Sequence, residues 1–198
     1  LPADARLLIV IDAMAVNDWK SARLALDRIE EQGGYDFLVP ILRAWTQFAA
    51  RDADPITTLA AVPRGSLTSS YAGEHRALIL IASGKRAEGV AAVKALGARD
   101  ARMVPARLAA AAKLYAVKDK EGALELLQGN DVAIAAARAL VEAGKPLAGS
   151  IDTPARGMGA LLARVSGDLM RDRVSPVALS LARLARIADP RSEQLAIV

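Results

Sequence analysis

Four short segments with the composition of a turn between two helices recur at nearly equal intervals along this chain of 198 residues. They begin at Asn17, Asp52, Gly84 and Lys118, so that successive elbows start 35, 32 and 34 residues apart. A period near 34 residues with two helices per unit is typical of helical-repeat proteins. Because one such unit cannot bury its apolar face alone, the spacing predicts helix pairs that stack and present a long surface.

The composition favours helices in close contact. Apolar residues make up 53% of the chain, but aromatic residues only 4%, and 43 positions are alanine. Alanine has the highest helix propensity and lets helix backbones approach one another. Long alternation of apolar and polar residues, which would indicate strands, is missing. We therefore expect an all-α fold with about 11–12 helices.

The period divides the chain into three parts. Residues 1–130 are predicted to form four helix pairs. The period fails over residues 131–152, which are expected to form a helix followed by an irregular loop. Residues 153–198 are expected to form a further pair and the start of another helix. The helices are expected at about 3–16, 18–32, 35–51, 54–62, 67–82, 86–96, 101–117, 120–127, 131–143, 153–171, 175–188 and 191–198.

Small residues fall early in the second helix of most expected pairs, where the two helices of a unit would touch, at Ala22, Gly89, Ala123 and Ala178. Pro190 follows the last pair. This arrangement resembles the tetratricopeptide repeat family, and residues 40–45 and 75–84 resemble its bacterial, alphaproteobacterial members. Thr57 departs from the small-residue pattern, and the Trp-Leu-Gly-Tyr pattern of the family's first helix is missing.

The resemblance implies a right-handed superhelical solenoid of helix-turn-helix repeats, with the first helix of each unit lining a concave face. It implies that a protein or peptide partner binds on that face, and it favours a periplasmic or exported location over a cytoplasmic one. In the opposing interpretation, many concave-face positions are buried against residues 131–153. The positions expected to contact a partner are Arg43, Thr46, Tyr71, Glu74, His75, Leu78 and Tyr115.

No catalytic template fits the sequence. The single histidine, His75, has no serine in a nucleophile elbow to activate, and the chain has no cysteine. Acidic residues are not spaced as metal ligands. We therefore predict no catalytic, cofactor-binding or metal-binding residue and no enzymatic activity. Gly157 and Gly159 are expected to allow close helix contact, and Trp45 is expected to lie in the core.

The charge is mildly positive, at +4, and the C-terminal arginines alternate with acids, as on a solvated helix face. Nucleic acid is therefore not an expected partner. The longest aliphatic run, residues 7–11, is too short to span a membrane, and no signal peptide is visible. Three alternatives stay open: an RNA-binding helical repeat, the interaction module of a longer enzyme or assembly factor, and self-association through the apolar residues Leu195, Ile197 and Val198.

Overall fold

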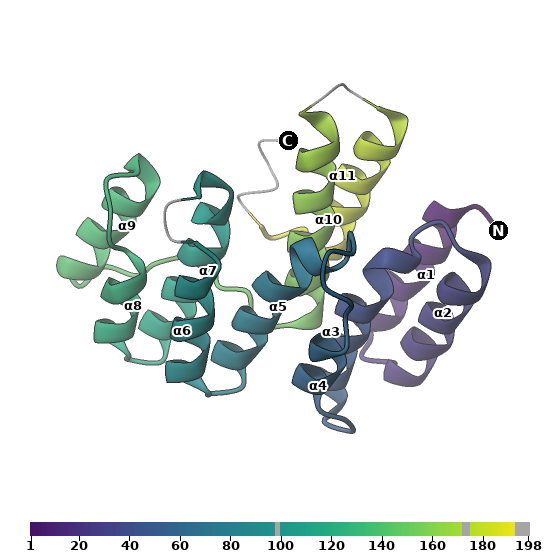
Figure 1. Cartoon of the computed structure of the whole chain (residues 1–198), viewed down its shortest axis with the longest axis horizontal. Coiled ribbons are helices and arrows are strands. Elements are labelled where there is room, and N and C mark those ends of the chain that lie inside the picture. Colours follow the sequence, from purple (N-terminus) through teal and green to yellow (C-terminus); the bar gives the residue numbers. More distant parts are fainter. Residues whose placement is uncertain (98–99, 172–174, 193–198) are drawn as a thin grey trace. The chain divides into compact units, whose positions relative to one another are not determined.

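The computed structural model describes residues 1–97, 100–171 and 175–192 (Figure 1). Regular structure in these residues is entirely helical, which confirms the all-α prediction. Residues 191 and 192 are not helical, and the rest of the helix predicted at 191–198 lies outside the described residues. The α-helices are α1 (Ala3–Ala15), α2 (Trp19–Gln32), α3 (Val39–Ala50), α4 (Pro55–Ala60), α5 (Ser69–Ala82), α6 (Arg86–Ala95), α7 (Val104–Ala116), α8 (Lys120–Leu126), α9 (Val132–Glu142), α10 (Pro154–Met170) and α11 (Pro176–Ala188).

Two short 3₁₀ turns explain why a proline is accommodated near the start of α3 and of α7. Asp36–Leu38 precedes α3 and Ala101–Met103 precedes α7. Each turn brings Pro40 or Pro105 into the first turn of its α-helix, where no intrahelical N–H bond is lost. The single helices predicted at 35–51 and 101–117 are therefore each a 3₁₀ turn followed by an unkinked α-helix.

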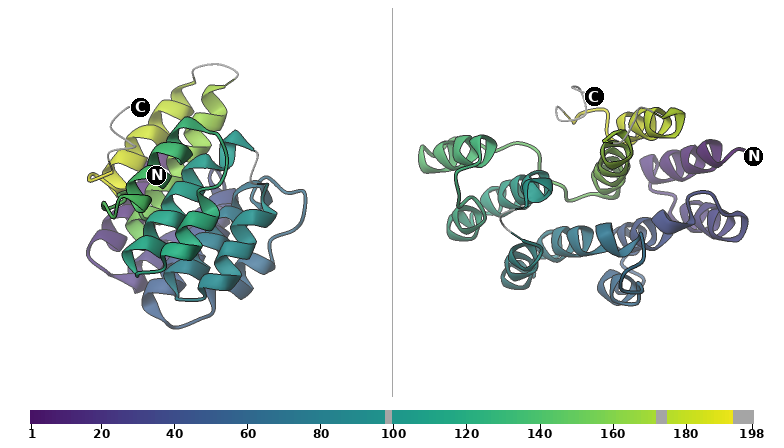
Figure 2. Two further views of the ribbon diagram at one scale, coloured as in Figure 1. Left: turned by 90° about the vertical axis from the view of Figure 1, so that its left-hand side faces the viewer. Right: turned by 45° about the horizontal axis from the view of Figure 1, so that its top comes forward.

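The helices form two compact units. Unit 1 contains residues 1–71 together with the C-terminal segment from Thr153, and unit 2 contains Ala72–Asp152. The C-terminal pair α10–α11 therefore packs with α1 and α3 of the N-terminal pairs, and not as the next layer after α9. Figure 2 shows α10 and α11 beside α1.

Most elbows share one backbone geometry. One residue per elbow has a left-handed conformation, and the next residue donates its N–H to the carbonyl five residues earlier, which caps the C-terminus of the first helix. The left-handed residues are Asn17, Arg51, Gly84, Lys118 and Gly144. The capping bonds, each 2.9 Å from N to O, run from Asp18 to Ala13, from Lys85 to Leu80, from Asp119 to Leu114 and from Lys145 to Leu140.

The second elbow is longer than the other elbows. The residue that corresponds to the small position in this pair is therefore not the predicted Thr57. The helix cap of this elbow, Asp54, comes three residues after the left-handed Arg51 and not directly after it. The position four residues after the cap, which is Ala22, Gly89 or Ala123 in three other pairs, is therefore Thr58. Thr58 Oγ1 donates to Gln47 Oε1 at 2.7 Å, whereas Thr57 is exposed and bonds Asp54.

Glycine allows α10 to approach α3 closely in unit 1. A Cβ atom at Gly157 would lie 2.2 Å from Cε2 of Trp45, whose side chain is 0% exposed. A Cβ atom at Gly159 would lie 3.0 Å from Cβ of Asp189, at the end of α11. The close helix contact predicted at both glycines and the core position predicted for Trp45 are confirmed.

A carboxylate joins the first helix of unit 1 to the last. Asp4 on α1 accepts a hydrogen bond of 2.6 Å from the Tyr35 hydroxyl and another from Ser180 Oγ on α11. Burial, followed by the bond to Asp4, raises the pKa of the Tyr35 phenol. The phenol therefore remains a donor throughout the physiological range, and Asp4 ties three segments together.

Bonds to backbone carbonyls and ion pairs connect the segments of unit 2. Arg107 on α7 donates to the Leu126 carbonyl at the end of α8, at 2.7 Å and 3.0 Å. Arg138 on α9 donates to the Leu127 carbonyl at 3.1 Å. The segment after α9 is not helical, and its Asp152 pairs with Lys113 on α7 at 3.0 Å.

None of the helices in the described part of the chain combines the length and apolar character needed to cross a membrane. The finding agrees with the expectation from the sequence for these residues.

Candidate binding groove between α6 and α8

Most residues expected to contact a partner are buried in this structure. Thr46, Tyr71, Glu74, His75 and Leu78 all lie in the core of their units. The Thr46 hydroxyl donates to the Leu42 carbonyl of its own helix at 2.9 Å. None of these five residues is more than 7% exposed in this structure.

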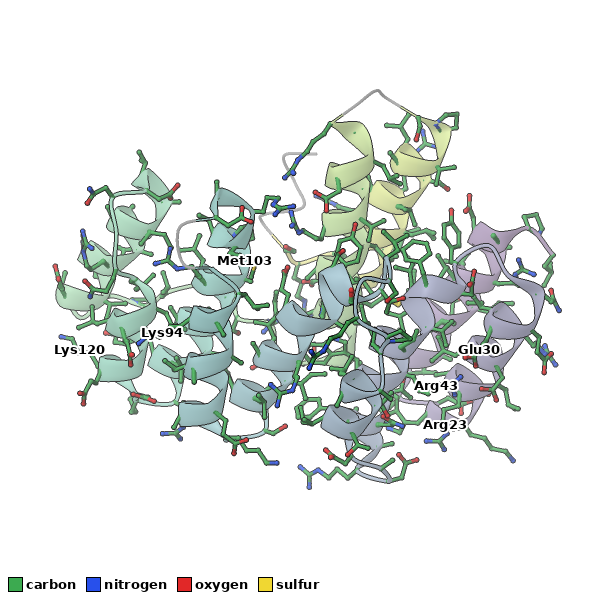
Figure 3. All side chains as sticks on the ribbon, viewed as in Figure 1. Arg23, Glu30, Arg43, Lys94, Met103 and Lys120 are labelled. Carbon is green, nitrogen blue, oxygen red and sulfur yellow. The ribbon has the colours of Figure 1, made fainter. Side chains whose placement is uncertain are left out.

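The remaining two expected residues are half-buried. Arg43 on α3 forms ion pairs with Asp27 at 2.8 Å and with Glu30 at 2.9 Å, both on α2. Figure 3 shows Arg43 beside Glu30. Arg43 therefore links two helices of unit 1, while Tyr115 lies on α7 of unit 2. Of the seven residues, Arg43, Thr46 and Tyr71 belong to unit 1, and Glu74, His75, Leu78 and Tyr115 belong to unit 2.

His75 is 1% exposed, and burial lowers the pKa of its imidazole to about 3. The charged form loses its hydration on burial in the core, so the neutral form dominates near pH 7. The ring therefore acts as a neutral core group on α5.

Non-sequential packing explains the burial on the first helices of unit 1. Leu7, Ile11 and Met14 on α1, the first helix of the first pair, are also buried. Helices α10 and α11 pack against α1, and α10 packs against α3. In a linear array each unit contacts only its neighbours, so the repeat register does not predict this cover.

An open groove lies between the second helices of two successive pairs in unit 2. We call it the α6–α8 groove. Its volume is about 590 Å³, which falls within the usual range for ligand sites. Its lining residues come from α6 and from α8 with its N-cap, and they are Arg86, Ala87, Val90, Ala91, Lys94, Asp119, Glu121, Gly122 and Glu125.

Small residues keep the α6–α8 groove open. Ala87 and Ala91 are exposed on α6, and Gly122 faces them from α8. On the other side of α6, Gly89 fits against α5, where an added Cβ would lie 2.3 Å from Cγ1 of Ile81. Gly89 therefore seats α6 on α5, while the two alanines leave space on the face toward α8.

Charges of both signs border this space. Lys94 Nζ and Glu125 Oε1 lie 2.5 Å apart and bridge the two helices, and Figure 3 labels Lys94 on α6. Asp119 caps α8 by accepting from the Gly122 N–H at 2.9 Å. Within the described residues, Arg86 and Glu121 have no ion pair. One cation and one anion are therefore available to a bound chain.

The side chains that line the α6–α8 groove are of three kinds. Its lining contains apolar methyl groups, carboxylates and cationic side chains, but no hydroxyl or imidazole side chain. The described residues also contain no group of three or more acidic or histidine side chains that could hold a metal ion. The repeat register missed this groove because it placed the site on the first helices. The exposed alanines four residues apart on α6 are the signal that could have indicated it.

Comparisons with protein-family models, with curated proteins and with solved structures give no match. The tetratricopeptide resemblance therefore stays a prediction from the sequence.

Proposed function

We propose that this protein is a non-enzymatic scaffold of tetratricopeptide-like helix pairs that binds a segment of a partner protein. The α6–α8 groove is the observation that carries this proposal, because it is open, has ligand-site volume and contains Arg86 and Glu121, which have no ion pair within the described residues. The repeated elbows support the scaffold class, since the left-handed residues Asn17, Arg51, Gly84 and Lys118 recur after 34, 33 and 34 residues.

The chemistry of the groove favours a peptide as the ligand. Ala87, Val90 and Ala91 supply an apolar strip along α6, which suits small or aliphatic side chains. Arg86 suits an acidic side chain of the peptide, and Glu121 suits a basic one. The partner segment is therefore an extended or helical peptide that carries both charges around an apolar centre.

Filling the groove tests this proposal. A partner captured with the wild-type chain from an extract of the source cells is identified and its affinity is measured by calorimetry. Ala91→Trp places a large side chain in the groove and is expected to weaken binding at least tenfold. The control Ala60→Trp changes an exposed alanine on α4 of the other unit and is expected to leave the affinity unchanged.

Reversing the charge at Arg86 tests the electrostatic part of the proposal separately. Arg86→Glu is expected to weaken binding several-fold, with a difference from wild type that shrinks as salt is added. Equal affinities for wild type, Ala91→Trp and Arg86→Glu would refute the groove as the binding site. Capture of nucleic acid alone would favour the RNA-binding alternative over a peptide-binding scaffold.

A further inference from the structure

Helix α9 ends in the same elbow as the first helices of complete pairs, but no second helix follows it. Gly144 has a φ of 70°, and the Lys145 N–H donates to the Leu140 carbonyl at 2.9 Å. The equivalent elbows at Gly84 and Lys118 lead directly into α6 and α8. Residues 145–152 form no helix. Unit 2 therefore contains a first helix without the partner helix that its elbow geometry normally introduces.

The uncovered side of α9 is apolar. Val132 is 85% exposed and Leu140 is 38% exposed, although both are aliphatic. Exposed alanines complete one stripe with the spacing of a helix face, so that Val132, Ala136, Ala139 and Ala143 follow at i, i+4, i+7 and i+11. The opposite side, with Ile134, Ala137 and Val141, is buried where α9 packs on α7 and α8. Helix α9 thus has two apolar sides, one buried against α7 and α8 and one exposed.

The two ends of this stripe carry opposite exposed charges. Asp131 caps the N-terminus of α9, and both of its hydrogen bonds, to the N–H groups of Ala133 and Ile134, end on Oδ1. Lys145 follows the C-terminus and has no ion pair within the described residues. Positions 131 and 145 lie at equal distances in sequence from position 138. An antiparallel copy of α9 centred on position 138 would therefore bring each Asp131 level with Lys145 of the second copy.

We propose that a second copy of this chain covers the exposed stripe, with the two α9 helices packed antiparallel in a twofold-symmetric dimer. In this register Leu140 lies opposite the partner's Ala136, so each large side chain meets a small one. Because the interface is isologous, every contact occurs twice, including the two Asp131–Lys145 ion pairs. Charge complementarity at both ends selects the antiparallel arrangement over a parallel one, which would place like charges together.

Oligomeric state is the first test. Sedimentation equilibrium of the full chain over a range of concentrations is expected to show a monomer–dimer equilibrium. Leu140→Glu places a charge within the stripe and is expected to raise the dimer dissociation constant at least tenfold. The matched control is Leu24→Glu, at an exposed leucine of α2 in unit 1, which is expected to leave the dissociation constant unchanged. Circular dichroism of both variants verifies that they fold.

Engineered cysteines test the antiparallel register, since the chain has none of its own. Ala139→Cys lies next to the dyad and is expected to form a disulfide-linked dimer rapidly in mild oxidant. Val132→Cys alone is expected not to do so, because the two positions would be about 18 Å apart along the helix axis. A mixture of Val132→Cys and Ala143→Cys chains is expected to cross-link as a heterodimer, because both positions lie on the stripe and nearly opposite each other in this register.

Three results would overturn the proposal. A monomer at all concentrations would show that no second copy binds. Loss of the dimer in Leu24→Glu but not in Leu140→Glu would place the interface elsewhere. Rapid cross-linking of Val132→Cys, without cross-linking of the mixed pair, would show a parallel arrangement.

Discussion

At the scale of single residues, the structure depends on positions where one methyl group would not fit. Gly157 lies against the indole of Trp45, and Gly89 lies against Ile81. Other glycines have open space around them, as at Gly167 on α10. Alanine at Gly157 and alanine at Gly167 are therefore expected to change stability in opposite directions. At Gly157 the added methyl group clashes with packed atoms, whereas at Gly167 it only raises the helix propensity.

Gly157→Ala is expected to destabilise unit 1 by about 1–3 kcal/mol, because the new methyl group forces Trp45 from its position. Gly167→Ala on the same helix is expected to stabilise it by up to about 1 kcal/mol through helix propensity. Urea unfolding of both variants measures the difference. Equal stabilities would mean that α10 and α3 are not in the close contact described.

The buried His75 predicts a pH dependence of stability. Its pKa is about 3 in the folded chain, below the ordinary value of 6.5, so the unfolded chain binds a proton first as the pH falls. The free energy of unfolding is therefore highest above pH 6.5 with respect to this group, and it falls as the pH is lowered below 6.5. Between pH 7 and pH 5.5 the free energy of unfolding is expected to fall by about 1 kcal/mol. His75→Gln should remove most of this slope in the same urea titrations, since no other histidine is present.

At the scale of elements, the elbows determine where each pair turns. A left-handed residue and a capping bond end the first helix, and in three pairs Asp18, Asp54 or Asp119 caps the second by accepting from backbone N–H groups. The sequence placed these boundaries within a few residues, because caps, glycines and helical periodicity act locally. The longer second elbow was missed, since the left-handed Arg51 carries no compositional signal.

Gly84→Ala tests the backbone requirement at an elbow without a steric contribution. Gly84 has a φ of 84°, and an added Cβ would have no atom within 4 Å. The expected loss of about 1 kcal/mol therefore comes from the left-handed conformation alone. Thermal unfolding of this variant beside Gly167→Ala measures it. A more stable Gly84→Ala chain would show that the elbow does not need this conformation.

At the scale of the whole molecule, the division into two units decides which helices depend on one another. Helices α10 and α11 follow α9 in the sequence, but they belong to the unit that contains α1 and α3. Asp4 contributes directly, because it accepts from Tyr35 and from Ser180 on α11. Local opening of α1 is therefore expected to be coupled to local opening of α11.

Asp4→Ala is expected to destabilise unit 1 by about 1–3 kcal/mol, since it leaves the Tyr35 and Ser180 hydroxyls without their acceptor. Native-state hydrogen exchange should show faster exchange in α1 and α11 of this variant. Exchange in α7 and α8 of unit 2 should remain at the wild-type rate. Faster exchange confined to α1 would mean that the Asp4 bonds do not join the two ends.

The sequence by itself determined the helices of this protein, their approximate bounds, the elbows and the small residues at Gly157 and Gly159. Most of these features depend on interactions between residues that are close along the chain. The close contacts at the two glycines depend on the absence of a side chain. Only the tertiary structure decided that α10 and α11 cover α1 and α3, that His75 and Thr46 are buried, and that a groove opens between α6 and α8. Those outcomes depend on contacts between distant segments, and of the three only the groove has a local signal, the alanines four residues apart on α6.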